Sequence, residues 1–210
     1  GFSLAFGDAR TNFNIQNGGS AVHISRSKNV KIYEGEFRFC GSCGVVYFTS
    51  VSNCGIYNSF SNPASLGYSS YAVDTWVDNS NSYTNDVEII NCSSWAETVI
   101  RDGKVIGSTI YSSKASVGVE GDTNLCKVII KGCTFKDCYA NGNDHYLGMA
   151  IFSYNSDVLC ENNIIDNCAF ALYKRDTLTN DGVVKFINNT CLNLTTNGIV
   201  LKRFIFTNSH

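Results

Sequence analysis

The stretch GMAIFSYNSDVLCENNIIDNC, from Gly148 to Cys168, contains one whole copy of a repeat that runs through most of this chain. A small residue and a short apolar strand come first, followed by a polar turn and a second short strand. An Asn pair, a third short apolar segment and an Asn-Cys step complete the unit. Variants recur from about Ser20 to Phe204. A repeat of short strands spaced roughly 20 to 50 residues apart is typical of a solenoid.

The second strand of each unit aligns with its copies in two apolar columns. The leading column contains Val30, Cys54, Val87, Val128, Val158 and Val184. The column two residues later contains Ile32, Ile56, Ile89, Ile130, Cys160 and Phe186. Because alternate residues of a strand share one face, both columns predict a common buried interior.

Two columns of small or amide residues follow these apolar positions. The first contains Glu34, Asn58, Asn91, Gly132, Asn162 and Asn188. The next contains Gly35, Ser59, Cys92, Cys133, Asn163 and Asn189. Such residues suit a tight bend, and stacked Asn amides can hydrogen-bond along the column. A further column of Cys40, Cys138 and Cys168 lies later in the unit.

The first and third strands of the units align less regularly. The first strands read Ala21-Val-His-Ile, Val45-Val-Tyr-Phe, Ala72-Val-Asp-Thr, Gly118-Val-Glu-Gly, Ala150-Ile-Phe-Ser, Ala171-Leu-Tyr-Lys and Ile199-Val-Leu-Lys. The third-strand positions are Phe37, Trp95, Phe135 and Ile165. The longer spacings predict insertions at 67–87 and 98–128, where 105–111 forms either an extra coil or a loop.

Three short strands per unit predict an all-β chain that folds as a right-handed parallel β-helix of about 6 to 8 coils. We expect an initial strand or cap remnant at 1–19, the β-helix at 20–204 and a tail at 205–210. The repeat resembles the pectate-lyase-like β-helix superfamily and, within it, the tailspike depolymerases of bacteriophages. That superfamily contains hydrolases, lyases, epimerases and non-catalytic adhesins, so the resemblance predicts the fold more closely than the activity.

Composition excludes some functions. The net charge of −2 provides no basic footprint for nucleic acid, and no apolar run is long enough for membrane insertion. A weakly charged surface rich in Asn, Ser, Thr and Tyr suits a glycan better. Most of the 10 Cys fall in the interior columns, where Cys acts as a small hydrophobe. We therefore predict neither a metal site nor a cofactor, and expect assembly in a reducing cytosol.

Polar and aromatic residues alternate with the core positions of the first strand and predict an outward strip. The predicted catalytic carboxylates on this strip are Asp74, Glu120 and Asp122. The predicted substrate-binding residues are Tyr47, Trp76, Phe152, Tyr154, Tyr173 and Arg175. Glycoside hydrolysis needs two carboxylates, one protonated and one ionised. Exposed aromatic rings provide flat faces for sugars, and Arg175 can hold an acidic sugar.

Other residues are alternatives if the register differs. Glu97, Asp102 and Asp78 lie in or near the insertions. The loop residues Asp144, His145 and Tyr146 resemble the base and acid of some polysaccharide lyases, but a polar turn between coils is the favoured explanation, since loops gather such residues.

The leading hypothesis is a tailspike-type depolymerase fragment that binds and hydrolyses a bacterial surface polysaccharide, either capsule or O-antigen. A polysaccharide lyase of the same fold and a non-catalytic receptor-binding or structural β-helix are the alternatives. The resemblance implies a homotrimer for the intact protein and a place in the phage virion after assembly in the host cytoplasm. Secretion is the alternative location.

Overall fold

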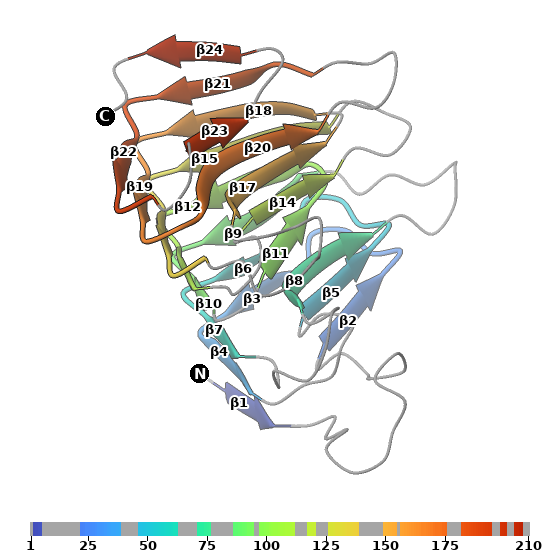
Figure 1. Cartoon of the computed structure of the whole chain (residues 1–210). Helices are drawn as coiled ribbons and strands as arrows, with labels where there is room; N and C mark the ends of the chain where they lie inside the picture. Colours follow the sequence, from blue (N-terminus) through green and yellow to red (C-terminus); the bar gives the residue numbers. More distant parts are fainter. Residues whose placement is uncertain are drawn as a thin grey trace, which may run out of the picture.

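The computed structural model describes residues 2–5, 22–38, 46–62, 71–76, 86–94, 97–111, 117–120, 126–138, 149–154, 156–175, 182–194, 198–200 and 204–207. These residues form 24 strands and no helix. The strands lie in three sheets of eight, and each sheet takes every third strand of the chain. Figure 1 shows the strands stacked along one direction, with β1 and β24 at opposite ends.

Sheet 1 contains β1 (Phe2–Ala5), β4 (Gly35–Arg38), β7 (Phe60–Asn62), β10 (Ser93–Ser94), β13 (Thr109–Tyr111), β16 (Thr134–Lys136), β19 (Ile164–Asp166) and β22 (Thr190–Leu192). Sheet 2 contains β2 (Val22–Ser25), β5 (Val46–Thr49), β8 (Tyr71–Trp76), β11 (Glu97–Ile100), β14 (Val117–Glu120), β17 (Met149–Tyr154), β20 (Phe170–Arg175) and β23 (Gly198–Val200). Sheet 3 contains β3 (Lys31–Tyr33), β6 (Gly55–Tyr57), β9 (Val87–Ile90), β12 (Gly103–Ile106), β15 (Cys126–Lys131), β18 (Ser156–Glu161), β21 (Val184–Ile187) and β24 (Phe204–Thr207).

Neighbouring strands pair in parallel in all three sheets. The prediction of an all-β chain with parallel sheets is therefore confirmed, and the arrangement is consistent with a parallel β solenoid. We call three consecutive strands, one from each sheet, a repeat unit.

The two apolar columns predicted for the second strand are confirmed in sheet 3. Ile32 pairs with Ile56 and Ile56 pairs with Ile89. Further along the sheet, Ile130 pairs with Cys160 and Cys160 pairs with Phe186. All six of these side chains are buried and belong to one hydrophobic core: Ile32, Ile56, Ile89, Ile130, Cys160 and Phe186.

The segment around Val105 is an extra repeat unit rather than a loop. Val105 pairs with Ile89 on one side and with Ile130 on the other. Its side chain is buried in the same core. Strands β11, β12 and β13 therefore form a complete unit between β10 and β14, which the sequence left as one of two alternatives.

The predicted bends occur where sheet 3 passes into sheet 1. The residues at these bends have φ between +49° and +62°: Glu34, Asn58, Asn91, Gly107, Gly132, Asn162 and Asn188. Asn and Gly are the residues that adopt this left-handed conformation most readily. These residues are exposed, whereas the residues of the next column, among them Cys133, Asn163 and Asn189, are buried.

Three details of the predicted alignment were wrong. Gly118 pairs with Phe152 and Glu120 pairs with Tyr154, so this strand is displaced by two residues from the predicted register. A displacement by two preserves the alternation of faces, and the hydrophobic pattern cannot detect it. Ile199, not Val200, pairs with Leu172.

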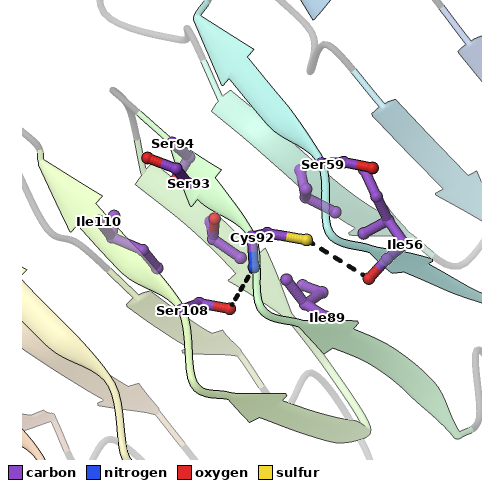
Figure 2. A pocket seen from close by; sticks show the side chains of 10 residues that line it. Ile56, Ser59, Ile89, Cys92, Ser93, Ser94, Ser108 and Ile110 are labelled. Carbon is purple, nitrogen blue, oxygen red and sulfur yellow. Dashed lines mark hydrogen bonds between the residues drawn. The ribbon is translucent and has the colours of Figure 1, made fainter. Parts of the chain in front are cut away.

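The third error concerns the short strand β10. Its inward position is Ser94, which is buried and pairs with Ile110. The predicted residue at this place, Trp95, lies outside the described residues. Small side chains near Ser94 leave an interior void of about 10 Å³ beside Cys92 (Figure 2). A void of that size holds at most about one water molecule, so it is no ligand site.

Candidate functional site

The predicted strip lies on the outer face of sheet 2, and the register divides it into two groups. Tyr47 pairs with Asp74, and Thr49 pairs with Trp76. Glu120, Tyr154 and Arg175 are neighbours on three successive strands. Glu120 thus occupies the position at which the sequence predicted Asp122, and Asp122 itself lies outside the described residues.

Asp74 and Glu120 are not neighbours. Strand β11 lies between their strands, and Val99 pairs with Asp74 on one side and with Gly118 on the other. Two strand spacings and two residues along the strand separate their Cα atoms by roughly 12 Å. One strand of the extra repeat unit thus separates these two predicted catalytic residues in the sheet.

The middle of this outer face is covered. Val99 and Phe152 are each only 2% exposed, although neither belongs to the interior core. The Phe152 ring stacks on that of Tyr173, with a centroid distance of 6.1 Å. Phe152 is thus packed rather than open to a sugar ring. The side chains of the other members are outside the described set: Asp74, Trp76, Glu120, Tyr154 and Arg175.

A second surface, on the outer side of sheet 3, forms a groove of about 820 Å³. It lies where strands β12, β15, β18 and β21 begin. Twelve residues line it: Asp86, Asp102, Gly103, Lys104, Lys127, Val128, Ile129, Asp157, Val158, Leu159, Val183 and Lys185. This volume falls within the range of small-molecule sites.

Three aspartates and one lysine form a row along one side of the groove. Val87, Gly103, Val128 and Val158 pair in register. The residues directly before them are therefore neighbours in the order Asp86, Asp102, Lys127 and Asp157. Adjacent parallel strands lie about 4.8 Å apart, so Asp86 and Asp102 are adjacent carboxylates.

The environment of Asp102 disfavours its charged form. Partial burial, the largest cause, raises the pKa of the Asp102 carboxyl above its ordinary value, and the negative charge of Asp86 raises it further. Hydrogen bonds from the backbone of Lys127 and of Asp86 oppose this shift. The Asp86 side chain is exposed. The two neighbouring carboxyl groups therefore differ in solvation.

The carboxylates of Asp102 and Asp157 each accept a hydrogen bond from the next repeat unit. Oδ1 of Asp102 accepts a hydrogen bond from the Lys127 backbone N–H at 3.2 Å. Oδ1 of Asp157 accepts one from the Val183 N–H at 2.7 Å. Each bond helps to fix the orientation of its carboxyl group.

The floor of the groove is apolar. Ile129 is 40% exposed and pairs with Leu159, which pairs in turn with Lys185. Val183, two residues before Lys185, is 37% exposed. Ile129 alternates with the buried Val128 and Ile130, which is why it must face outward. Lys104 and Lys185 line the same groove. A flat apolar floor edged by charged groups fits a sugar, which has both apolar ring faces and hydroxyl groups.

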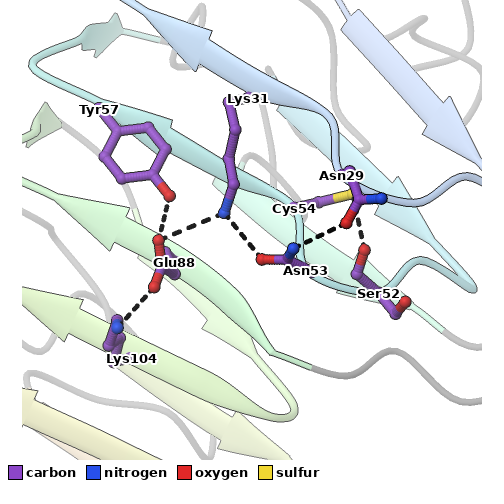
Figure 3. A network of polar contacts seen from close by, with 8 residues as sticks. All are labelled: Asn29, Lys31, Ser52, Asn53, Cys54, Tyr57, Glu88 and Lys104. Atoms are coloured by element: carbon purple, nitrogen blue, oxygen red, sulfur yellow. Dashed lines mark hydrogen bonds and ion pairs between the residues drawn. The ribbon is translucent and has the colours of Figure 1, made fainter.

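A polar network adjoins the groove through Lys104 (Figure 3). The Lys104 ammonium contacts Glu88 Oε1 at 2.5 Å. Glu88 Oε2 accepts hydrogen bonds from Lys31 Nζ at 3.3 Å and from the Tyr57 hydroxyl. Hydrogen bonds from Lys104, Tyr57 and Lys31 lower the pKa of Glu88 to about 2. Glu88 is therefore an ionised structural centre and not a proton donor.

The residues predicted as alternative site residues lie in different parts of the chain. Asp102 lies in the groove. Glu97 begins β11 and pairs with Tyr71, and its side chain is outside the described set. Asp78 and the loop of Asp144, His145 and Tyr146 lie outside the described residues.

Asp86 and Asp157 are not among the site residues predicted from the sequence. A signal for them exists, because Asp86, Asp102 and Asp157 each stand directly before an inward position of the second strand. Within the described ranges, no group of three or more His, Cys, Asp or Glu could hold a metal ion. Within the same ranges, no helix has the length and hydrophobicity needed to cross a bilayer.

No protein-family model matches the chain, and no curated protein sequence matches it. One solved structure with a similar arrangement is described as "Glycoside hydrolase". It superposes with a TM-score of 0.46 and 9% sequence identity, and the alignment covers 90% of this chain and 38% of that chain. The chain thus spans less than half the length of that structure. The function proposed below therefore rests on the residues of this chain.

Proposed function

We propose that the chain binds a polysaccharide in the groove on sheet 3 and hydrolyses it with the adjacent carboxylates Asp86 and Asp102. The observation that carries this proposal is their position. They are register neighbours at the rim of an 820 Å³ groove with an apolar floor. Partial burial and the charge of Asp86 raise the pKa of Asp102, which is the direction that a general acid requires.

Asp102 is the general acid in this proposal. Its half-buried carboxyl protonates the oxygen of the leaving sugar, and its proton is held by burial and by the neighbouring charge. Asp86 is exposed, and in this proposal its carboxylate attacks or stabilises the anomeric carbon. Carboxyl groups about 5 to 5.5 Å apart give retention of configuration, and adjacent strands bring the pair close to that separation. We therefore expect a retaining enzyme.

The wider setting rests on the resemblance of the repeat. The eight strands of each sheet fit a right-handed parallel β-helix of eight coils. The resemblance supports a bacterial capsule or O-antigen as the glycan that it degrades. The same resemblance supports a phage tailspike, a homotrimer in the intact protein and assembly in the host cytoplasm before incorporation into the virion.

The test is release of reducing ends from panels of bacterial capsular and lipopolysaccharide glycans. Asp102→Asn and Asp86→Asn should each lower turnover by a factor of at least about 10³ and leave glycan binding nearly intact. Asp166→Asn is the matched control, because Asp166 lies on sheet 1, away from the groove, and its carboxylate accepts a hydrogen bond from Asn193. Full activity of both groove variants would exclude this site.

The alternatives have their own signatures in the same assay. A lyase would produce an unsaturated sugar with ultraviolet absorbance, whereas a hydrolase would not. Binding without any new reducing ends would identify a receptor-binding β-helix.

The strip on sheet 2 is a second candidate for the same reaction. The backbone register favours it, because Glu120, Tyr154 and Arg175 occupy neighbouring positions on three strands of the sheet. Glu120→Gln and Asp74→Asn belong in the same assay. Loss of turnover in these variants alone would move the active site to sheet 2.

A further inference from the structure

Tyr33 is the most exposed of the large hydrophobic side chains that the structure describes, at 57%. It lies on the outer face of sheet 3, in the same column as Tyr57. The two rings stack, with centroids 4.8 Å apart and planes inclined by 18°. One face of the Tyr33 ring is therefore supported by Tyr57, while much of its remaining surface contacts solvent.

The supporting ring is itself held in place. The Tyr57 hydroxyl donates a hydrogen bond to Glu88, and the Lys31 ammonium lies 5.4 Å from the centre of the Tyr57 ring. Lys31 also donates to Asn53 Oδ1 at 3.1 Å (Figure 3). An exposed aromatic ring on such a fixed base loses little side-chain entropy when a ligand stacks on it.

The groove and this tyrosine pair are continuous. Lys104 lines the groove and also contacts Glu88, which in turn contacts Tyr57. From strand spacing and rise, the backbone of Tyr33 lies roughly 16 Å from that of Asp86. A short oligosaccharide can span this distance, and its hydroxyl groups would pass over the charged groups of Lys104 and Glu88.

We propose that Tyr33, supported by Tyr57, is a distal subsite that stacks on the apolar face of a pyranose ring of the glycan bound in the groove. This inference rests on the proposed function, because it places one more sugar unit of the same substrate. The face of the pyranose ring carries C–H groups, which suit the face of the Tyr33 ring. The network of Lys31, Glu88 and Lys104 donates and accepts hydrogen bonds at the edge of the sugar.

The subsite would be reached only by long oligosaccharides, and this gives a direct test. The probe is an array of oligosaccharides of graded length cut from bacterial capsular and lipopolysaccharide glycans. Wild-type protein should bind the long members more tightly than the short ones. Tyr33→Ala should lower affinity for the long members by about tenfold, the scale of one aromatic contact, and leave the short members unchanged. Tyr33→Phe should retain the affinity, because the ring remains.

Two controls separate this subsite from general damage. Tyr111→Ala removes a tyrosine from the outer side of sheet 1 and should leave the length dependence intact. The melting temperatures of the Tyr33 variants should stay close to that of the wild type, since surface changes rarely alter stability much.

The outcomes distinguish the two proposals. If Tyr33→Ala binds long oligosaccharides as tightly as the wild type while Asp102→Asn still loses turnover, the subsite is wrong and the proposed function stands. If Tyr33→Ala weakens long and short members equally, the tyrosine acts structurally and the subsite is also wrong. If the wild type neither binds nor cleaves any member of the array, the proposed function fails and the subsite fails with it.

Discussion

Asn163 and Asn189 occupy the same bend in two successive repeat units, and Nδ2 of Asn163 donates a hydrogen bond to Oδ1 of Asn189 at 2.8 Å. The same Oδ1 accepts the backbone N–H of Asn163 at 2.9 Å. One unit before, the N–H of Cys133 donates to Oδ1 of Asn163, also at 2.9 Å. Both Asn side chains are buried, so the ladder satisfies polar groups that have no access to water.

Asn163→Ala should destabilise the fold strongly. The substitution leaves the Cys133 N–H without its acceptor and removes the bond to the Ile130 carbonyl. We expect a loss of about 2 to 4 kcal/mol in the free energy of unfolding, measured by urea denaturation. The control is Asn162→Gly at the exposed, positive-φ position beside it, which should change stability by less than about 0.5 kcal/mol. Equal effects of the two variants would contradict a buried ladder.

Gly103 should tolerate no side chain. A Cβ atom there would lie 2.0 Å from the Val87 carbonyl oxygen, and φ is +134°. We expect Gly103→Ala to cost more than about 3 kcal/mol or to abolish folding. Gly132→Ala is the matched control, because its φ is +62° and nothing lies within 4 Å of the new methyl group. That variant should lose only about 1 kcal/mol, the ordinary cost of the left-handed conformation. Circular dichroism during thermal unfolding measures both.

Acid should weaken the network around Glu88. Its pKa in the folded protein is lowered from 4.5 to about 2, first by the hydrogen bond from Lys104. A lowered pKa gives stability that is present above pH 4.5 and is lost as the pH falls toward 2. The side chain is 20% exposed, and after allowance for solvent screening we expect a loss of roughly 1 to 2 kcal/mol.

Denaturation curves at several pH values test this prediction. Glu88→Gln should remove this part of the pH dependence. Glu161→Gln breaks an ion pair with Lys131, whose side chain is 48% exposed, and should have little effect. An unchanged acid profile in Glu88→Gln would show that the network contributes no stability.

The interior thiols should resist alkylation. Burial raises the pKa of Cys92 and that of Cys133 to about 11, and it raises the pKa of Cys160 as well. At about pH 8 these groups remain protonated, and the thiolate is the reactive form. Iodoacetamide should therefore modify half-buried Cys126 before these three, as read by mass spectrometry, and all should react in denaturant.

The same shifts predict a loss of stability in alkali. A thiol whose pKa is raised in the folded state stabilises the fold at pH values below 9.0, and that contribution falls as the pH rises toward 11. Rapid labelling of Cys92 by iodoacetamide in the native protein would contradict the burial of this thiol.

The interior of this protein could be predicted from its sequence. The columns through Ile32 and Val87 follow from the two-residue period of a buried strand, and the bends follow from the Asn and Gly that adopt positive φ. Both signals are local, and they recur along the repeat units.

The candidate site depended on the tertiary structure. The same alternation permits a strand to shift by two residues, so the pattern could not fix the register that separates Asp74 from Glu120. Asp86 lies beside Asp102 because strand β12 pairs with β9 on one side and with β15 on the other. This pairing joins residues across loops, and the repeat pattern does not specify the paths of those loops. Burial then set the proton affinity of Asp102, and burial is a property of the assembled groove rather than of any local sequence.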